Sequence, residues 1–118
     1  MADENSDSIL KTIRKMIGPE EDYTYFDTEL IININSAFSR LCQLGVGNTA
    51  PTPFKITGEE EEWSDFIDDG YQEEVKTYVF LKTKLIFDPP SNGTVINVYK
   101  EEIDRLEWLL KEVAADGY

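Results

Sequence analysis

The chain has 118 residues with 24 acidic and 11 basic side chains, and its formal net charge is −13. This length predicts one domain, and an apolar fraction of 41% is typical of a folded chain. Electrostatic repulsion of this size argues against direct binding to the phosphate backbone of nucleic acids. The lack of histidine and the presence of a single cysteine, Cys42, exclude an internal disulfide, a zinc site and Cys-His catalysis.

The chain also lacks the sequence features of an exported or membrane-inserted protein. Its first residues, MADENSDS, contain neither the basic region nor the apolar stretch of a signal peptide. No window approaches the run of about twenty apolar residues that a bilayer-spanning helix requires. We therefore expect an intracellular protein that does not enter a membrane, with residues 1–7 as an N-terminal arm on a single helical domain of residues 1–118.

The N-terminal third is predicted to form two amphipathic helices. Ser8 can cap the first helix, and the Gly-Pro pair at 18–19 ends it. The second helix begins at Asp27 or Thr28 and ends at Gly45, which can adopt the left-handed conformation without a Cβ penalty. The apolar residues at helical spacing are Ile9, Leu10, Ile13 and Ile17 in the first helix and Leu30, Ile31, Ile34, Phe38 and Leu41 in the second.

Residues 45–62 are predicted to form a loop between the second and third helices, because glycine and proline interrupt any regular pattern there. Within this loop, residues 54–57 alternate as a short strand would, and Gly58 offers a turn before the acidic run 59–62. The segment is therefore either a minor hairpin or an extended loop.

Further helical segments are expected in the C-terminal half. Ser64 can cap a short turn, a third helix spans about residues 72–87, and Pro89 and Pro90 end it. A fourth helix follows and leaves residues 114–118 as a C-terminal tail. The residues at helical spacing are Phe66 and Ile67 in the short turn, Val75, Tyr78, Val79, Lys82, Leu85 and Ile86 in the third helix, and Val95, Tyr99, Ile103, Leu106, Leu110 and Val113 in the fourth. The predicted fold class is mainly α, a compact bundle of about four helices.

No arrangement of side chains in the sequence predicts catalysis, a cofactor or a metal. The serines lack the Gly-x-Ser-x-Gly and Ser-x-x-Lys patterns of nucleophilic enzymes. The acidic run 59–62 and the pair Asp68 and Asp69 lack EF-hand spacing, so we interpret them as a solvated face. Gly45 is interpreted as part of a helix end and not of a phosphate loop, and Cys42 as a small buried hydrophobe and not a reactive thiol.

Five residues are candidates for contact with a protein partner. Trp63 and Phe66 flank an acidic loop, and Trp108 lies beside the apolar stripe of the last helix. One interpretation places these three in a small core, and the other makes one or two of them anchors for a partner, because tryptophan is enriched at interface hot spots. Val113 continues the apolar character of the last helix and Tyr118 adds an amphipathic ring. The helix end and tail are therefore predicted to dock on a neighbouring protein.

Several short motifs of the chain resemble small head-to-tail connector proteins of tailed phages. The motifs are Phe26-Asp27 ahead of LIININSAF at 30–38, QLGVG at 43–47, VKTY at 75–78 and FDPP at 87–90, together with Trp63 and Glu107-Trp108. The resemblance extends from about Ser8 to Val113 and rests on packing, capping and turn residues.

This resemblance implies a mainly helical adaptor subunit of the virion neck that is made in the host cytoplasm. Such a subunit forms a homo-oligomeric ring under the portal protein, extends the DNA exit channel and gives a tail-proximal stopper or tail-completion protein a docking surface. No catalytic residue is transferred by the resemblance. The acidic composition is compatible with the role, because a negatively charged channel wall lets DNA pass without specific binding.

Two other classes of function remain open. An acidic chain of this size could mimic DNA and inhibit a nucleic-acid-binding enzyme, or serve as another small protein-binding module. A DNA mimic would be a monomer or dimer that competes with DNA for its target. An enzyme that uses only carboxylates would need several buried acidic side chains gathered in a cleft.

Overall fold

The computed structural model describes residues 7–18, 26–47, 54–67 and 69–115, and in these ranges it contains helices and no strand. The elements in chain order are α1 (Ile9–Ile17), α2 (Asp27–Gln43), α3 (Trp63–Phe66), the 3₁₀ turn η1 (Asp69–Tyr71), α4 (Gln72–Phe87) and α5 (Gly93–Ala115). The predicted mainly α fold is confirmed. The four longer helices are those expected from the apolar spacing, and α3 is the short turn between them.

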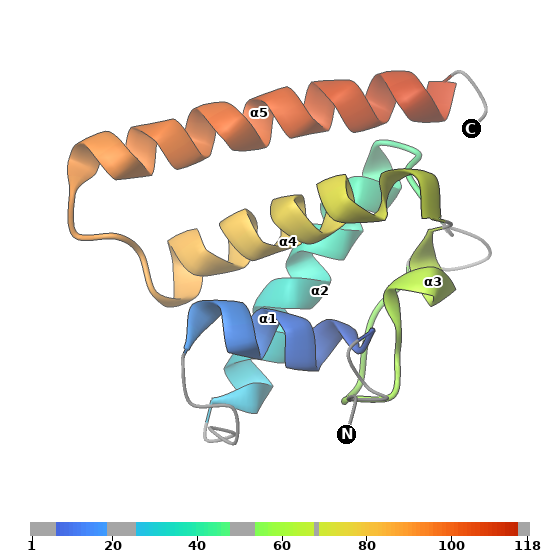
Figure 1. The fold of residues 1–118 in the computed structure, drawn as a ribbon, viewed down its shortest axis with the longest axis horizontal. Helices are drawn as coiled ribbons and strands as arrows, with labels where there is room; N and C mark the ends of the chain where they lie inside the picture. Colours follow the sequence, from blue (N-terminus) through green and yellow to red (C-terminus); the bar gives the residue numbers. More distant parts are fainter. Residues whose placement is uncertain (1–6, 19–25, 48–53, 68, 116–118) are drawn as a thin grey trace.

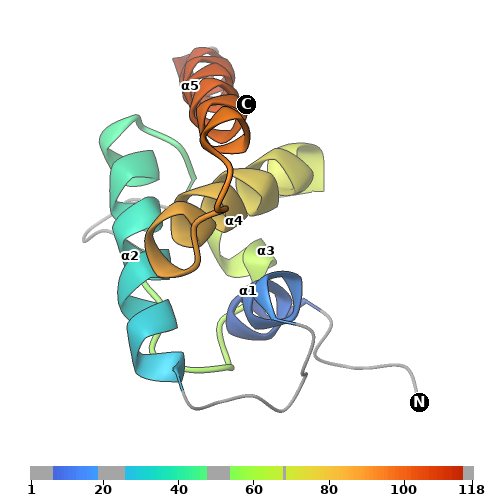
Figure 2. The same ribbon diagram turned by 90° about the vertical axis from the view of Figure 1, so that its left-hand side faces the viewer.

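Helix α4 lies at the centre of the bundle and contacts the four other α-helices. Figure 1 shows α5 lying along one side of α4 and α1 on the other side, and Figure 2 shows α2 passing beside α4. Every α-helix contributes buried apolar side chains to the shared core. They include Ile9 and Ile13 of α1, Ile34 and Phe38 of α2, Trp63 and Phe66 of α3, Tyr78 and Val79 of α4, and Leu106 and Leu110 of α5.

Helix α1 begins at Ser8 as predicted, because the Ser8 Oγ accepts a hydrogen bond from the third backbone N–H of the helix (3.3 Å). The start of α1 also pairs with the chain that precedes α3. The Ile9 N–H donates to the carbonyl of Glu61 (3.0 Å), and the Trp63 N–H donates to the carbonyl of Asp7 (3.2 Å). These backbone bonds fix the entry to α3 against α1.

Two glycines with left-handed backbone follow α2. Gly45 and Gly47 have φ angles of +84° and +74°, a region that side chains with a Cβ adopt at a cost. Gly47 also lies against the Phe66 ring, where a Cβ would come within 2.5 Å of Cζ, whereas Gly45 has open space around it. The prediction that Gly45 helps to end the helix is confirmed, and Gly47 is required by packing as well.

Residues 54–62 form an extended segment, and of the two predicted alternatives the hairpin is wrong for these described residues. The Ile56 N–H donates to Oδ1 of Asn35 (2.7 Å), and the Ile56 carbonyl accepts from Nδ2 of the same side chain (3.0 Å). One amide on α2 therefore takes the place of a partner strand. Glu61 closes the turn that follows by accepting from both the backbone N–H (3.1 Å) and the hydroxyl (2.8 Å) of Thr57.

The cap of α3 is Glu62, so the prediction of a cap at Ser64 is wrong. The backbone N–H of Glu62 donates to Oδ2 of Asp65 (2.9 Å), which is the reach-back bond of a capping box. Ser64 lies inside the helix and is exposed. Trp63 thereby becomes the first residue of α3, and its side chain is directed into the core.

The buried face of α4 is wider than the single stripe that was predicted. Ile86 was expected in the stripe but is 60% exposed, while Leu81 and Thr83 are buried. A central helix with neighbours on several sides buries more than one face, so a one-stripe pattern misassigns its residues. Thr83 Oγ1 is fully buried and has no hydrogen-bond partner in the part of the chain that the structure describes.

In α5 the buried residues are confined to the middle of the helix. Ile103, Leu106 and Leu110 are buried as predicted, whereas Val95 is 37% exposed. The first turns of α5 extend past the part of the helix that packs on α4. The prediction that Val95 is buried is therefore wrong, because helical spacing cannot show which turns of a long helix lack a neighbour to pack against.

Candidate protein-docking surface

Trp108 lies on the outward face of α5. It comes two residues after Leu106 and two before Leu110, which are both 1% exposed, so it points about 160° away from each around the helix axis. Its side chain is 65% exposed, the largest exposure among the big apolar side chains that the structure describes. The core interpretation is wrong for Trp108, and its role as an interface anchor stays a prediction.

Trp63 and Phe66 are buried in the core, at 0% and 2% exposure. The Trp63 Nε1 donates to the Thr12 hydroxyl (3.3 Å), and the Phe66 ring lies edge-on to Phe38 at 4.7 Å between centroids. Phe54 closes the cluster at 5.2 Å from Phe66. Neither Trp63 nor Phe66 can contact a partner in this fold. The core interpretation therefore holds for both.

The remaining predicted interface residues lie near the C-terminal end. Val113 is half-buried in the last turns of α5. Tyr118 lies outside the described residues, as do residues 1–6 of the predicted N-terminal arm. Trp108 and Val113 therefore both lie on α5, whereas Trp63 and Phe66 lie on α3 in the core.

Other apolar side chains are exposed that the sequence did not mark as interface residues. Ile86, at 60%, lies in the last turn of α4, and Val98, at 55%, lies in the first half of α5. Ile32, at 62%, and Met16, at 46%, lie on α2 and α1. Val98, Ile32 and Met16 fall outside the predicted stripes, which is the one signal by which the sequence could have identified them.

The surface of the described residues includes two grooves. One of about 300 Å³ lies between α4 and α5, and its lining consists of Lys82, Leu85, Ile86, Lys100, Ile103 and Asp104. The other, of about 440 Å³, lies where α1, α2 and α4 meet, and its lining consists of Arg14, Ile17, Gly18, Phe26, Leu30, Phe87 and Asp88. Each is lined by both apolar and charged side chains.

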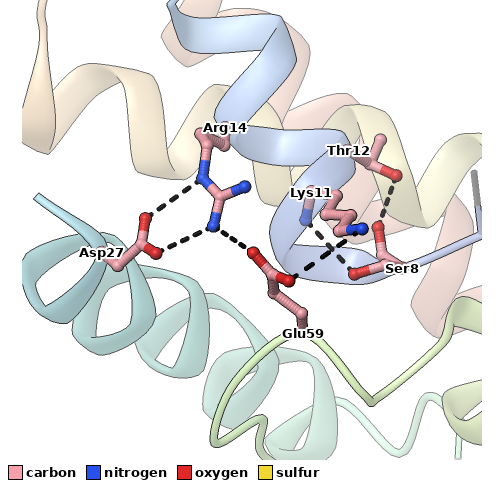
Figure 3. A network of polar contacts seen from close by, with 6 residues as sticks. All are labelled: Ser8, Lys11, Thr12, Arg14, Asp27 and Glu59. Atoms are coloured by element: carbon pink, nitrogen blue, oxygen red, sulfur yellow. Dashed lines mark hydrogen bonds and ion pairs between the residues drawn. The ribbon is translucent and has the colours of Figure 1, made fainter. Parts of the chain in front are cut away.

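Arg14 joins α1, α2 and the extended segment (Figure 3). This guanidinium is buried, with Nε and Nη2 donating to the two carboxylate oxygens of Asp27 (3.1 and 2.8 Å) and Nη2 also to Glu59 (2.7 Å). Burial acts to lower the pKa of Arg14, but the two carboxylates outweigh it and raise that pKa above its ordinary value. No sequence motif marks Arg14, because its acidic partners are distant along the chain.

A second polar cluster joins α5 to α2 and α4. Glu107 accepts hydrogen bonds from the Tyr78 hydroxyl (2.6 Å) and from Nη2 of Arg40 (3.2 Å). Burial acts to raise the pKa of Glu107, but these two bonds outweigh it and lower that pKa below its ordinary value. Burial and the bond to Glu107 both raise the pKa of Tyr78. Glu107 therefore fixes the side of α5 that faces the bundle, next to the outward Trp108.

The described residues show no arrangement suited to a metal or to the bilayer. In these ranges no three Asp, Glu or Cys side chains gather closely enough to hold a metal ion. Cys42 is a free thiol, half-buried against the core. Asp68 and the side chain of Asp69 lie outside the described residues. Across the same part of the chain, no helix has the length and apolar character to cross a membrane.

Comparison with known families covers nearly the whole chain. A family model described as "Phage connector protein" matches residues 9–117, which include every helix from α1 to α5. No curated protein and no solved structure matches the chain. The predicted resemblance to phage connectors is thus confirmed. The chain belongs to the phage connector protein family and is a structural protein of the bacteriophage head-tail connector.

Proposed function

We propose that the chain is an adaptor subunit that forms a ring beneath the portal protein in the virion neck. The ring continues the DNA exit channel and gives a tail-proximal stopper or tail-completion protein a docking surface. Membership of the connector family supports the connector role. The observation that carries the docking role is Trp108, 65% exposed on the outward face of α5.

An outward tryptophan suits a docking element for energetic reasons. α5 packs chiefly on α4, so its outer face is open to a neighbour. Tryptophan is enriched at interface hot spots, and its truncation at an interface centre commonly costs about 2 kcal/mol or more. We propose that the portal or an adjoining subunit covers α5 from Trp108 onward and wraps around the end of the helix to reach Val113, which lies about 140° from Trp108 around the helix axis, and Tyr118.

The acidic composition supports the channel role. A chain with a net charge of −13 repels phosphate, so a ring of such chains lets DNA slide through without specific binding. In this proposal the subunit acts as one helical domain over residues 1–118, performs no chemistry and needs no cofactor. It is made in the host cytoplasm and incorporated during particle assembly.

Cryo-electron imaging of the neck without imposed symmetry tests the proposal. We expect several copies in a closed ring under the portal. Trp108→Ala should bind the portal or the adjoining subunit roughly thirtyfold more weakly than the wild type, the equivalent of about 2 kcal/mol. Met16→Ala is the matched control, because it removes an exposed side chain from α1. A single copy per particle would contradict the ring, and a free monomer that displaces DNA from an enzyme would favour the DNA-mimic alternative.

A further inference from the structure

The basic side chains of the chain divide into two groups, according to whether a carboxylate lies near. Six of the eleven form ion pairs with acidic side chains: Lys11, Arg14, Arg40, Lys76, Lys84 and Arg105. The other five have no carboxylate within 4.0 Å in the ranges that the structure describes: Lys15, Lys55, Lys82, Lys100 and Lys111. Lys82 Nζ lies over the Tyr78 ring, 5.8 Å from its centroid, which still leaves it without a carboxylate in ion-pair distance. In a chain with 24 acidic side chains, these five cations lack a salt-bridge partner among the described residues.

Two of the available lysines lie in the same groove. Lys82 of α4 and Lys100 of α5 line the groove of about 300 Å³ between these helices, and Asp104 is the one acidic residue of its lining. Two positive charges and one negative charge give a local charge of +1, against −13 for the chain. Ile86, 60% exposed, forms part of the apolar lining. The groove therefore combines an apolar surface with a positive charge on a protein that is otherwise strongly acidic.

The most concentrated acidic run among the described residues lies on the other side of the bundle. Residues 59–62 are four consecutive glutamates in the extended segment, and Figure 1 shows that segment across α4 from α5. Arg14 engages Glu59, and Thr57 engages Glu61. Glu60 is exposed and forms no ion pair with any described residue. One chain thus carries an acidic run and a basic groove on two different faces.

We propose that the groove between α4 and α5 receives the acidic run 59–62 of a neighbouring copy of the chain. The inference rests on the proposed ring and names its subunit contact. Two copies with a charge of −13 each repel one another, so a stable contact has to pair a basic surface with an acidic one. A contact between two different faces is heterologous, and repetition of such a contact closes into a ring when the rotation permits.

The chemistry of the two faces fits this contact. Glu60, the one glutamate of the run without a partner among the described residues, would pair with Lys100 or Lys82 at the rim of the groove, with the strength and orientation of a charge-assisted hydrogen bond. The neighbouring copy would also cover the exposed Ile86. The contact removes exposed apolar surface and gives an unpaired cation an acidic partner.

Charge reversal tests the contact in phage that carry the variant gene. We expect Lys82→Glu with Lys100→Glu to weaken ring assembly at least tenfold, measured as copies per particle by quantitative mass spectrometry. Lys15→Glu is the matched control for Lys100→Glu alone, since both lysines are exposed and the change in charge is the same, while Lys15 lies outside the groove and outside residues 54–62. Wild-type unfolding temperatures for all three variants would show that the loss is one of assembly. Equal incorporation of Lys100→Glu and Lys15→Glu would overturn the proposal.

A swap of the two charges tests the identity of the occupant. Glu60→Lys alone and Lys100→Glu alone should each reduce incorporation, and the double variant should recover at least part of it, because the pair is restored with reversed sign. If the double variant is incorporated no better than the product of the two single losses predicts, the run 59–62 does not occupy the groove.

A photo-crosslinking residue at position 86 gives a readout that does not depend on folding of the charge variants. A product that joins position 86 to residues 54–62 of another copy supports the contact. A product with a different segment or a different neck protein, or no product in particles that hold several copies, overturns it. If particles hold a single copy, the ring fails as well, so failure of the contact and failure of the ring are distinguished by the copy number.

Discussion

The two tryptophans of the chain belong to two contrasting regions of the molecule. Trp63 is fully buried in the body, by which we mean α1, α2, α3 and the side of α4 that faces them. Trp108 is 65% exposed on α5, which packs chiefly on α4 and buries only Ile103, Leu106 and Leu110. The body therefore buries its tryptophan in its own core, whereas α5 leaves aromatic and aliphatic surface exposed.

The two regions also differ in how their charges are used. In the body, Arg14 is buried and holds two carboxylates from separate segments. On α5, the pair of Arg105 with Glu102 is exposed, and Lys100 and Lys111 have no acidic partner among the described residues. Buried ion clusters determine which segments meet, whereas exposed charges contribute little to stability and more to the choice of partner. The difference shows that buried ion pairs hold the segments of the body together, whereas the charges of α5, the proposed docking helix, are exposed.

The largest predicted effect is that of Trp63→Ala. The substitution removes a fully buried ring and its bond to Thr12, so we expect the free energy of unfolding to fall by about 3–5 kcal/mol. Urea denaturation followed by circular dichroism measures this loss. Trp108→Ala is the control, and it should change stability by less than about 1 kcal/mol while impairing incorporation into particles. Similar losses of stability in both variants would show that the two regions do not differ as described.

The second prediction compares two glycines that follow α2. Gly47→Ala should destabilise the chain by about 2–4 kcal/mol, because it adds a left-handed alanine and a clash with Phe66. Gly45→Ala adds the same backbone strain in open space and should cost about 1 kcal/mol. Thermal unfolding of the two variants side by side measures the difference. If the two costs were equal, packing of the Phe66 ring on Gly47 would not contribute.

The third prediction concerns the ion cluster of the body. Arg14→Met retains much of the side-chain volume and leaves Asp27 and Glu59 facing each other without the cation. We expect the free energy of unfolding to fall by about 1–3 kcal/mol. The loss is at the lower end of this range if the two half-exposed carboxylates turn toward water. Arg105→Met on α5 breaks an exposed pair and should leave the unfolding temperature close to that of the wild type. If Arg14→Met leaves the free energy of unfolding unchanged, apolar packing alone holds α1 to α2.

Much of the body could be predicted from the sequence because local rules determine it. Ser8 as a cap, Gly45 at a helix end and Ile34 on a buried stripe each depend on neighbours within a few residues, and all three are confirmed. The hairpin was wrong because the partner of Ile56 is Asn35, 21 positions away along the chain. Periodicity says nothing of such distant hydrogen bonds.

The candidate site was harder to predict than the fold. The spacing of Trp108 from Leu106 and Leu110 indicates an outward direction, but it cannot show how much of that face a neighbouring helix covers. The bonds that tie the adjacent Glu107 to the bundle come from Tyr78 and Arg40, which are 29 and 67 positions away along the chain, so no local pattern predicts them. The groove between α4 and α5 depends on where the two helices separate. The sequence predicts that Ile86 is buried, but the structure exposes it in this groove. The spacing of apolar residues indicates which face of a helix they share, and it does not indicate how much of that face a neighbouring helix covers.

The smallest predicted effect concerns the polar tie between the two regions, and it is a dependence on pH. Glu107 has a lowered pKa in the folded chain, so its contribution to stability is fully present above its ordinary value of about 4.5 and is lost as the pH falls through the lower folded value. Glu107→Gln should cost about 1 kcal/mol at neutral pH, since one charge-assisted bond to Arg40 is replaced by a weaker one. Below pH 4.5 the difference between variant and wild type should shrink toward zero. Urea denaturation at several pH values measures it, with Glu112→Gln, an exposed substitution on the same helix, as the control. A difference that stays constant as the pH falls would mean that Glu107 holds α5 by packing and neutral hydrogen bonds, and that the charge of Arg40 adds nothing to the attachment of the docking helix.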